Sequence, residues 1–334
     1  MNRLHRLPLA ITIILAVAFT AATAAAQARE FRSSDTHSID YPTVQAVAHI
    51  DRLIRDLTGG RLGIQTMGHD DQDSENYTIA ELRNGTLDMA RINLAALNNS
   101  VPSTVVLSLP FLFKSKPQMR RVLDGPIGDE ILADLERQGL IGLCFYDTGA
   151  RSYYSSNKPI RNVRDMKNLK VRVQAADKSA EMIRAMGAEP VPLPFDRIRE
   201  ALEAGVIDAA ADNWTSYVTS RHHEVAKYYS HTEHNMAPSV LVFSKRVWDT
   251  LPKGDQKIIR AAAKESVPFM RKLWDDHASN ERATLTAPGS QIVDDVDRKS
   301  FSDFLLPLYP KLVSTPRLQA MVKRIQADER PSEY

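Results

Sequence analysis

Apolar residues along the chain alternate between two spacings, one typical of helices and one typical of short buried strands. From Pro42 they fall at helical spacing and stop at Gly59-Gly60, a pair that favours the end of a helix. The alternation continues with a strand expected at 61–67, a helix at 75–84, a strand at 87–94, helices between 116 and 138, and a strand at 140–146. Helices interleaved with short apolar strands predict an α/β fold with helices on the faces of a sheet.

A second α/β unit begins after residue 148. Its strands are expected at 151–156, 170–174 and 207–211, and its helices at 177–186 and 198–204; a further strand is expected at 239–244. Beyond them, a charged amphipathic segment from Asp255 to about Thr286 is far longer than an average helix and is expected to bridge two lobes. The chain is therefore expected to cross between the lobes near Thr148 and Met236, and again along this helix.

The fold class that follows is a two-lobed α/β fold with a long bridging helix. The first lobe is expected to comprise residues 29–148 and 237–275, and the second residues 149–236 and 276–334. With 334 residues, of which 43% are hydrophobic and 25% charged, the chain is long enough to give each lobe a core.

The first 26 residues have the composition of a secretory signal peptide. Arg3 and Arg6 make a basic start, Leu7 opens an almost wholly apolar run, and the run ends in alanines that offer cleavage after Ala26 or Ala28. A membrane anchor is the alternative, because the run approaches the ~20 residues that span a bilayer. Cleavage is favoured because the end of the run is nearly all alanine, which holds a membrane weakly. The mature chain is expected in the periplasm, with no direct membrane insertion.

The charge of the chain narrows the range of partners. Forty-three basic residues stand against 41 acidic ones, and loss of Arg3 and Arg6 with the signal peptide leaves 41 of each. A neutral protein lacks the electrostatic attraction that drives binding to nucleic acids or anionic membranes. Neither partner is expected.

Sequence signatures of catalysis and of cofactor binding are absent. The chain has no Gly-x-Ser-x-Gly elbow, no phosphate-binding loop, no His-Glu-x-x-His and no Gly-x-Gly-x-x-Gly. His222, His223, His231 and His234 gather in one segment, but no carboxylate accompanies them at metal-ligand spacing. The single cysteine, Cys144, lies in an apolar run and is expected to be a buried hydrophobe. No enzyme, catalytic residue, metal site or cofactor is therefore predicted.

Arg172 is the strongest candidate for ligand binding. Val171 and Val173 share one face of their strand, so Arg172 and Gln174 share the other, at the strand end where α/β sheets bind ligands. A solvated arginine at a sheet edge is the alternative. Arg151 also begins a strand beside the expected lobe boundary, and two guanidinium groups that converge on one cleft would form a fork for a carboxylate.

Five motifs occur in an order and spacing that resemble one family. They are Leu109-Pro110-Phe111-Leu112-Phe113, Gly149-Ala150-Arg151-Ser152, Leu169-Lys170-Val171-Arg172-Val173, Gly187-Ala188-Glu189-Pro190-Val191-Pro192 and Gly205-Val206-Ile207-Asp208. From about Ser33 to Pro268, the chain resembles the extracytoplasmic solute-binding proteins of TRAP transporters, the DctP-type family. The resemblance implies a two-lobed periplasmic binding protein fold that closes on a small organic acid and delivers it to membrane permease subunits. We expect the receptor to be a monomer.

The resemblance also implies which residues bind the ligand. The arginine that clamps the ligand carboxylate in the family falls on Arg172, the family's second arginine on Arg151, and its aromatic wall on Phe195. The remaining expected ligand contacts are His37, Glu75 and Asn93 from the first lobe, and Gln174, Asp212, Asn213 and Trp214 from the second.

Three positions depart from the family's usual pattern. Asp212 stands where members usually carry a ligand-facing asparagine, and Arg197 and Arg199 stand where they usually carry Glu and Tyr. A carboxylate beside a carboxylate ligand is repulsive unless it is paired or protonated. We therefore expect Asp212 to pair with one of these two arginines; hydrogen bonding to ligand hydroxyls is the alternative.

The ligand class follows from the same resemblance. The segments Trp214-Thr215-Ser216-Tyr217 and Leu97-Asn98-Asn99 are most similar to the branch that takes sugar acids, so a uronate or an aldonate is expected. Two rivals remain. A periplasmic hydrolase of sugar derivatives would use a carboxylate such as Glu75 or Asp212 as its base. A receptor of the ABC type would differ by the absence of the long bridging helix.

Overall fold

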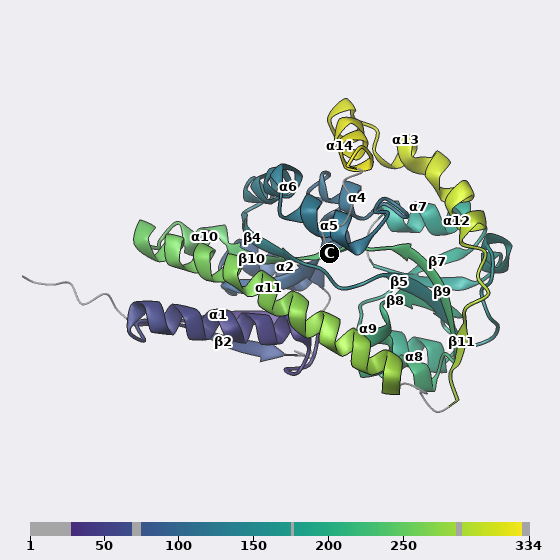
Figure 1. Ribbon diagram of the computed structural model, residues 1–334, viewed down its shortest axis with the longest axis horizontal. Helices are drawn as coiled ribbons and strands as arrows, with labels where there is room; N and C mark the ends of the chain where they lie inside the picture. The colour runs from purple at the N-terminus through teal and green to yellow at the C-terminus, as the bar shows by residue number, and fades with distance from the viewer. Residues whose placement is uncertain (1–27, 69–74, 175–176, 285–288, 329–334) are drawn as a thin grey trace, which may run out of the picture.

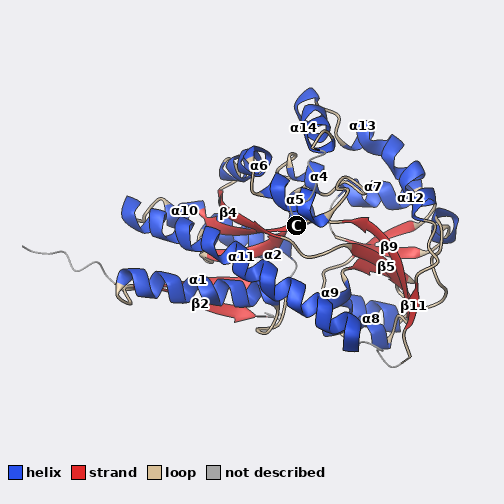
Figure 2. Ribbon diagram, viewed as in Figure 1, coloured by secondary structure: helices blue, strands red, loops and turns tan. Residues whose placement is uncertain are grey.

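The structure is a computed structural model that describes residues 28–68, 75–174, 177–284 and 289–328. These residues form two lobes, each built around a β-sheet that helices cover on both faces (Figure 1). Figure 2 shows the two sheets in red, one in each half of the molecule. The expected signal peptide lies outside the described residues.

The first lobe contains a five-stranded sheet in the order β2-β1-β3-β10-β4. Its strands are β1 (Arg29–Asp35), β2 (Leu62–Gly68), β3 (Met89–Asn93), β4 (Leu140–Tyr146) and β10 (Ser239–Ser244). β1 pairs in parallel with β2 and β3, whereas β10 returns from the second lobe and pairs antiparallel with β3 and β4. The apolar run of β4 is explained by its position, because its two faces contribute to two separate hydrophobic clusters.

The second lobe contains a six-stranded sheet in the order β11-β9-β5-β8-β6-β7. Its strands are β5 (Arg151–Ser155), β6 (Lys170–Val173), β7 (Glu189–Pro192), β8 (Ala209–Asp212), β9 (Tyr228–Asn235) and β11 (Gln291–Val293). β6 lies between β7 and β8 and pairs in parallel with both. Arg172 therefore extends from the interior of the sheet and not from its edge.

Helices flank both sheets. The first lobe carries α1 (Pro42–Thr58), α2 (Glu75–Asn84), α3 (Leu94–Leu97), α4 (Thr104–Leu107), α5 (Lys116–Leu123), α6 (Pro126–Glu136) and α10 (Lys245–Trp248). The second carries α7 (Asp177–Ala185), α8 (Ile198–Glu203), α9 (Trp214–Thr219), α12 (Arg298–Leu305) and the short 3₁₀ helices η1 (Val163–Met166), η2 (His222–Glu224) and η3 (Leu306–Leu308). In α1, Pro42 occupies the first turn, where its missing N–H costs nothing, and Gly59 ends the helix with a φ of 60°.

The first three connections between the lobes are two short crossovers and one long helix. The chain crosses between β4 and β5 at residues 147–150, and between β9 and β10 at residues 236–238. The third connection is α11 (Lys253–Thr284), which packs on α1 and β4 and reaches α9 in the second lobe (Figure 1). The long bridging helix expected from the sequence is thus confirmed.

A fourth connection departs from the expected division of the chain. After α12, the helices α13 (Tyr309–Leu312) and α14 (Pro316–Gln326) return to the first lobe. Their apolar side chains are buried there in one cluster with those of α4 and α5, and the Tyr309 hydroxyl donates to the Pro110 carbonyl at 2.5 Å. The assignment of all of residues 276–334 to the second lobe is therefore wrong.

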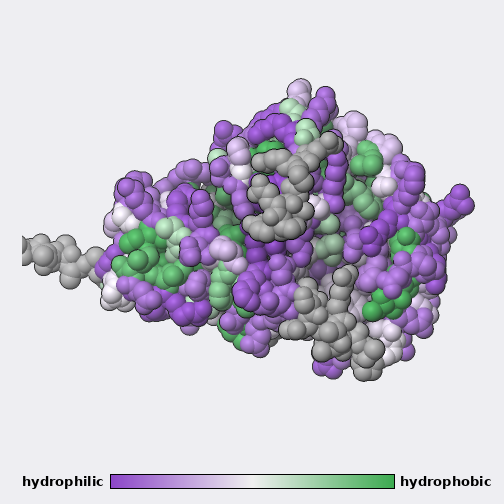
Figure 3. Space-filling view, viewed as in Figure 1, coloured by the Kyte–Doolittle hydropathy of each residue, from purple (hydrophilic) through white to green (hydrophobic). Residues whose placement is uncertain are grey.

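The surface of the described residues is mostly polar. Figure 3 shows hydrophilic residues over much of one face, with small apolar patches between them. Within the part of the chain that the structure describes, no helix combines the length and the hydrophobicity that a membrane span requires.

Candidate functional site

Arg172 is buried in the second lobe with most of its hydrogen-bonding capacity unused. Its residue is 7% exposed, and Nε donates to the Leu193 carbonyl at 2.9 Å. Among the described residues, no acceptor meets its two terminal nitrogens and no carboxylate lies within 4.0 Å. Burial lowers the pKa of Arg172, and the nearby charge of Arg151 lowers it further. A buried guanidinium with free donors is a site for an anion, and the alternative of a solvated edge arginine is excluded.

A cavity of about 100 Å³ lies against this guanidinium. It is lined from both lobes, so that a bound molecule would touch each of them. The polar residues along its wall are Asn93 and Ser108 from the first lobe, and Arg151, Arg172, Gln174, Ser179, His234 and Asn235 from the second. The structure therefore brings Asn93, Arg151, Arg172 and Gln174 together in one cavity.

Arg151 is paired within its own lobe. Its Nη1 lies 3.2 Å from Asp212 Oδ1, and its Nη2 donates to the Ala211 carbonyl. The pairing follows from strand register, because Ser152 in β5 is the direct partner of Asp212 in β8. Asp212 also accepts the Asn213 backbone N–H at 2.8 Å. The guanidinium of Arg151 thus lines the cavity and is held in place by Asp212 and the Ala211 carbonyl.

The expected pairing of Asp212 with Arg197 or Arg199 is wrong. The Arg197 side chain is 57% exposed and pairs with Glu200 at 2.8 Å, and Arg199 pairs with Glu224 at 2.9 Å. Both arginines lie at α8, where they are partly exposed and pair with acidic residues of α8 and of η2. Neither arginine therefore neutralises the negative charge of Asp212.

Glu75 provides the acidic group of the first lobe. Oε1 accepts from the backbone N–H of Asn93 at 2.7 Å and from its Nδ2 at 2.9 Å, and Oε2 accepts from Gln174 Nε2 at 3.1 Å. Burial raises the pKa of Glu75, while Arg91 and Asn93 oppose that shift. Since Gln174 belongs to the second lobe, this hydrogen bond joins the two lobes directly.

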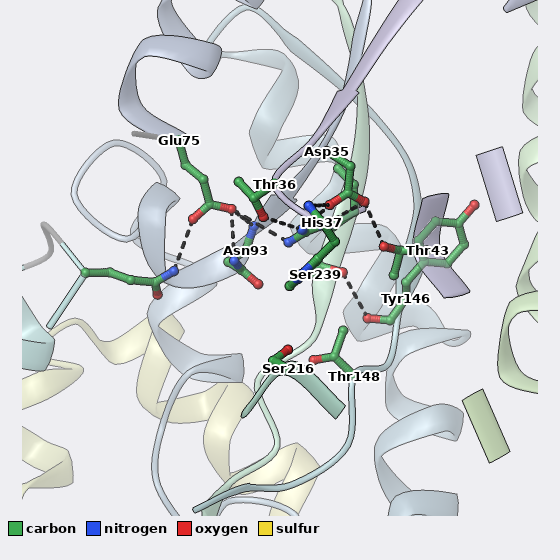
Figure 4. Close-up of polar contacts among 12 residues, drawn as sticks. Asp35, Thr36, His37, Thr43, Glu75, Asn93, Tyr146, Thr148, Ser216 and Ser239 are labelled. Carbon is green, nitrogen blue, oxygen red and sulfur yellow. Dashed lines mark hydrogen bonds and ion pairs between the residues drawn. The ribbon is translucent and has the colours of Figure 1, made fainter. Parts of the chain in front are cut away.

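Arg91 and Asp35 lie next to Glu75, and neither is among the site residues expected from the sequence. Arg91 is 2% exposed, its Nε donates to Asp35 Oδ2 at 3.1 Å, and Nη1 lies 3.8 Å from Glu75 Oε1. Figure 4 shows Asp35 and Glu75 as two carboxylates of one polar network, together with Asn93 and Thr43. Burial alone would raise the pKa of Asp35, but Arg91 lowers it below its ordinary value.

Aromatic rings also make contacts between the lobes. His37 stacks on Tyr41 with ring centroids 3.7 Å apart, and Phe195 of the second lobe meets His37 edge-on at 5.3 Å. The Tyr41 hydroxyl lies 2.9 Å from the hydroxyl of Ser216 in α9. His37 and Phe195 therefore face each other across the boundary between the lobes.

Two expected ligand contacts have structural roles. Asn213 caps α9, because its Oδ1 accepts the backbone N–H of Ser216 at 2.8 Å. The Trp214 ring packs on Tyr217 and Tyr229, with centroids 5.4 and 4.8 Å away, and its buried Nε1 finds no partner among the described residues. Trp214 thus packs within the second lobe, and its expected contact with the ligand stays a prediction.

A family comparison decides the class of protein. Residues 33–315 match the profile of the DctP family, described as bacterial extracellular solute-binding protein, family 7. The chain belongs to this family. Its members are periplasmic solute receptors of TRAP transporters, so this DctP-family chain is a receptor that binds a small organic acid and works with a membrane permease.

The chain is also similar in sequence to individual solute-binding proteins. A solute-binding protein of Chromohalobacter salexigens is 34% identical over 302 residues, which are 90% of each chain. The 2,3-diketo-L-gulonate-binding periplasmic protein of Escherichia coli is 28% identical over 303 residues, 91% of this chain and 92% of that protein.

Solved structures extend the similarity to the fold. A TRAP periplasmic solute-binding protein of Bradyrhizobium sp. BTAi1 in complex with D-galacturonate is 49% identical, with a TM-score of 0.87 over 89% of this chain and 99% of the other. One of Xanthobacter autotrophicus with bound β-D-galacturonate is 43% identical, with a TM-score of 0.86 over the same shares. One of Pseudomonas putida with bound D-glucuronate is 30% identical, with a TM-score of 0.87 over 92% of this chain and 99% of the other.

The histidine-rich segment of this DctP-family chain serves packing. Among the described residues, no group of three His, Cys, Asp or Glu side chains is arranged to hold a metal ion. His222 Nδ1 lies 2.8 Å from the Tyr154 hydroxyl, and His234 stacks on Tyr153 with centroids 4.1 Å apart. Burial lowers the pKa of His222 to about 4 and that of His234 to about 3.

Stability is therefore expected to fall as the pH is lowered below about 6.5, the ordinary pKa of histidine. Between pH 6.5 and 4, the unfolded chain binds protons at His222 and His234 that the folded chain excludes, so protonation favours unfolding. At pH 5 these two groups together cost about 4 kcal/mol relative to neutral pH. Thermal unfolding at pH 7.5 and pH 5 measures the loss. The doubly substituted His222→Gln, His234→Gln protein should lose clearly less stability, and an equal loss in both proteins would refute the assignment.

Proposed function

We propose that this receptor binds a hexuronate, D-galacturonate foremost, with the ligand carboxylate on Arg172. The observation that carries the proposal is the buried guanidinium of Arg172, whose terminal nitrogens have no acceptor among the described residues and which borders a cavity shared by both lobes. The ligands in the similar structures support the choice, since those at 49% and 43% identity hold galacturonate and one at 30% holds glucuronate.

The remaining side chains fit a polyhydroxylated acid. Arg151, braced by Asp212, adds a second positive charge beside Arg172. Asn93 and Gln174 present amides to the same cavity, where a sugar hydroxyl can both donate and accept. Phe195 offers a ring at the boundary between the lobes.

Binding between the lobes couples recognition to closure. We place the hinge at the two crossovers, residues 147–150 and 236–238, and at α11, which is the third connection between the lobes. A ligand that touches both lobes favours their closed arrangement, because only that arrangement offers all its contacts. We also propose that the mature receptor reaches the periplasm by removal of residues 1–26.

The hydrolase alternative finds no support in the site or in the family. The two carboxylates that such an enzyme would use are both bound to neighbouring groups of the protein: Glu75 accepts from Asn93 and Gln174, and Asp212 from Arg151 and Asn213. The family consists of solute-binding receptors.

A thermal-shift screen of the mature protein tests the proposal. Galacturonate, glucuronate, the matching aldonates and short dicarboxylates are compared, with D-galactose as the neutral control. A hexuronate at about 100 times its Kd should stabilise the fold by about 2.7 kcal/mol, and galactose should have no effect. Stabilisation by a short dicarboxylate but by no hexuronate would contradict the proposed ligand.

A further inference from the structure

Phe111 has a backbone conformation that an aromatic residue rarely adopts. Its φ is 56°, which lies in the left-handed region, where the Cβ atom of an L-residue is crowded by its own backbone. Among the described residues, Phe111 is the only one that combines an apolar side chain with a positive φ. Strain of this kind persists only where surrounding contacts hold the residue in place.

The strained turn sends the side chain of Phe111 to a different lobe from those of its neighbours. Leu109, Leu112 and Phe113 are buried in the hydrophobic cluster of the first lobe, together with side chains of α4 and α5. The side chain of Phe111 instead packs against the hydrophobic cluster that β6, α7 and α12 form in the second lobe. One residue of this first-lobe segment is therefore seated in the core of the other lobe.

Two hydrogen bonds tie the backbone of the same segment to β9 of the second lobe. The Phe111 N–H donates to the His234 carbonyl at 2.9 Å, and Asn235 Nδ2 donates to the Ser108 carbonyl at 2.7 Å. Residues 108–111 and 234–235 thus form a junction between the lobes, in which polar and apolar contacts act together.

The backbone of β9 is irregular on its side of this junction. The ladder between β5 and β9 is interrupted at residues 231–234, where one residue of β5 stands opposite four of β9. Glu233, within this bulge, has a φ of 41°. A bulge takes backbone groups out of the ladder and directs them elsewhere. The His234 carbonyl is thereby available to the N–H of Phe111.

The junction lies between the hinge and the cavity. His234 is two residues before the crossover at 236–238. Phe111 is not among the described residues that line the cavity, but the wall includes both sides of the junction, namely Ser108, Pro110, His234 and Asn235. The junction therefore determines how the two halves of the cavity face each other.

We propose that Phe111 is a positioning residue, the pivot that holds the two lobes in the alignment that binds the ligand. This inference rests on the proposed function in that it assumes a ligand bound between the lobes. Without the side chain of Phe111, the lobes adopt further arrangements in which the two halves of the cavity are not aligned. Because only the aligned arrangement binds, the apparent Kd rises as the population of that arrangement falls.

The test compares Phe111→Ala with Phe111→Gly. Both remove the ring, but only glycine adopts a φ of 56° without strain, so Phe111→Gly should melt roughly 2–4 °C above Phe111→Ala. In isothermal titrations, D-galacturonate and D-glucuronate should each bind about 5–30-fold more weakly to both variants than to the wild type. The factor should be the same for the two acids, because the residues that line the cavity are unchanged.

Small-angle X-ray scattering reports the alignment of the lobes directly. The apo radius of gyration should be larger in both variants than in the wild type. Saturating D-galacturonate should return it to the radius of the wild-type complex, because the bound ligand selects the aligned arrangement.

Phe113→Ala is the matched control, since it makes the same truncation two residues further on, in the core of the first lobe. It should lower the melting temperature but change both affinities by less than about threefold and leave the apo radius as in the wild type; Phe113→Leu takes its place if the alanine variant does not fold. Affinities within threefold of the wild type in both folded Phe111 variants, an equal loss in the folded control, or a loss that differs between the two acids would overturn the inference. If neither acid binds the wild type, the proposed function fails, and unchanged apo radii in the Phe111 variants would still refute the pivot.

Discussion

Sugar-acid affinity is expected to fall by about 2–5 kcal/mol when Arg172 is replaced by alanine, since the ligand carboxylate then enters the cleft unpaired. Arg172→Lys should restore only part of the affinity, because an ammonium group cannot reproduce the two-pronged contact of a guanidinium. Isothermal titration with galacturonate measures both. Arg197→Ala is the control, since that side chain is largely exposed and pairs with Glu200, and it should change the affinity by less than about threefold.

The stability of the same variant separates a binding role from a structural one. Arg172 is buried without an ion-pair partner among the described residues, a state that costs the apo protein free energy. Its removal should therefore leave the apo melting temperature unchanged or raise it. A loss of binding of less than threefold, or a loss accompanied by a clearly lower melting temperature, would contradict the role assigned to Arg172.

The second large effect is a loss of stability, which is expected when Asp35 is replaced by asparagine. Asp35→Asn keeps the size of the side chain but removes the nearest carboxylate of the buried Arg91 and leaves it only Glu75, 3.8 Å away, which costs about 3–5 kcal/mol of stability. For a chain of this size, the melting temperature should drop by roughly 5–8 °C. Asp303→Asn is the control, because Asp303 pairs with Lys299 on an exposed helix face, where such pairs contribute under about 1 kcal/mol. An equal drop of the melting temperature in the two variants would refute the claim that Asp35 stabilises the fold by pairing with Arg91.

The position of Arg172 could be predicted from the sequence because strand geometry is local. Val171 and Val173 define the buried face of a strand of four residues, and Arg172 must then point to the other side. The long helix was equally predictable, since its amphipathic pattern continues through α11 without a glycine after Gly254. In both cases neighbouring residues carry all the information.

The charge pairs could not be predicted in the same way, because their partners are distant in sequence. Asp35 and Arg91 are 56 residues apart and meet through the pairing of β1 with β3. Asp212 and Arg151 meet because β5 and β8 are aligned in one register, whereas the arginines near Asp212 in sequence lie on the solvent-facing side of α8. A pairing inferred from nearby residues therefore selected the wrong arginine.

The strand β9 was missed for a different reason. Its buried positions include Ser230, Thr232 and His234, so an apolar alternation is absent. These polar groups are satisfied inside the sheet, as when the Thr232 hydroxyl accepts the backbone N–H of Tyr153 at 3.1 Å. The C-terminal helices α13 and α14 illustrate a further limit, since their amphipathic pattern predicts burial but does not say against which lobe.

The central claim is that a sugar acid binds between the lobes with its carboxylate on Arg172, and a crystal structure of the receptor with D-galacturonate tests it most directly. We predict carboxylate oxygens within about 3 Å of the terminal nitrogens of Arg172, with sugar hydroxyls near Asn93 and Gln174. Galacturonate bound with its carboxylate away from Arg172, or bound to one lobe only, would contradict the account.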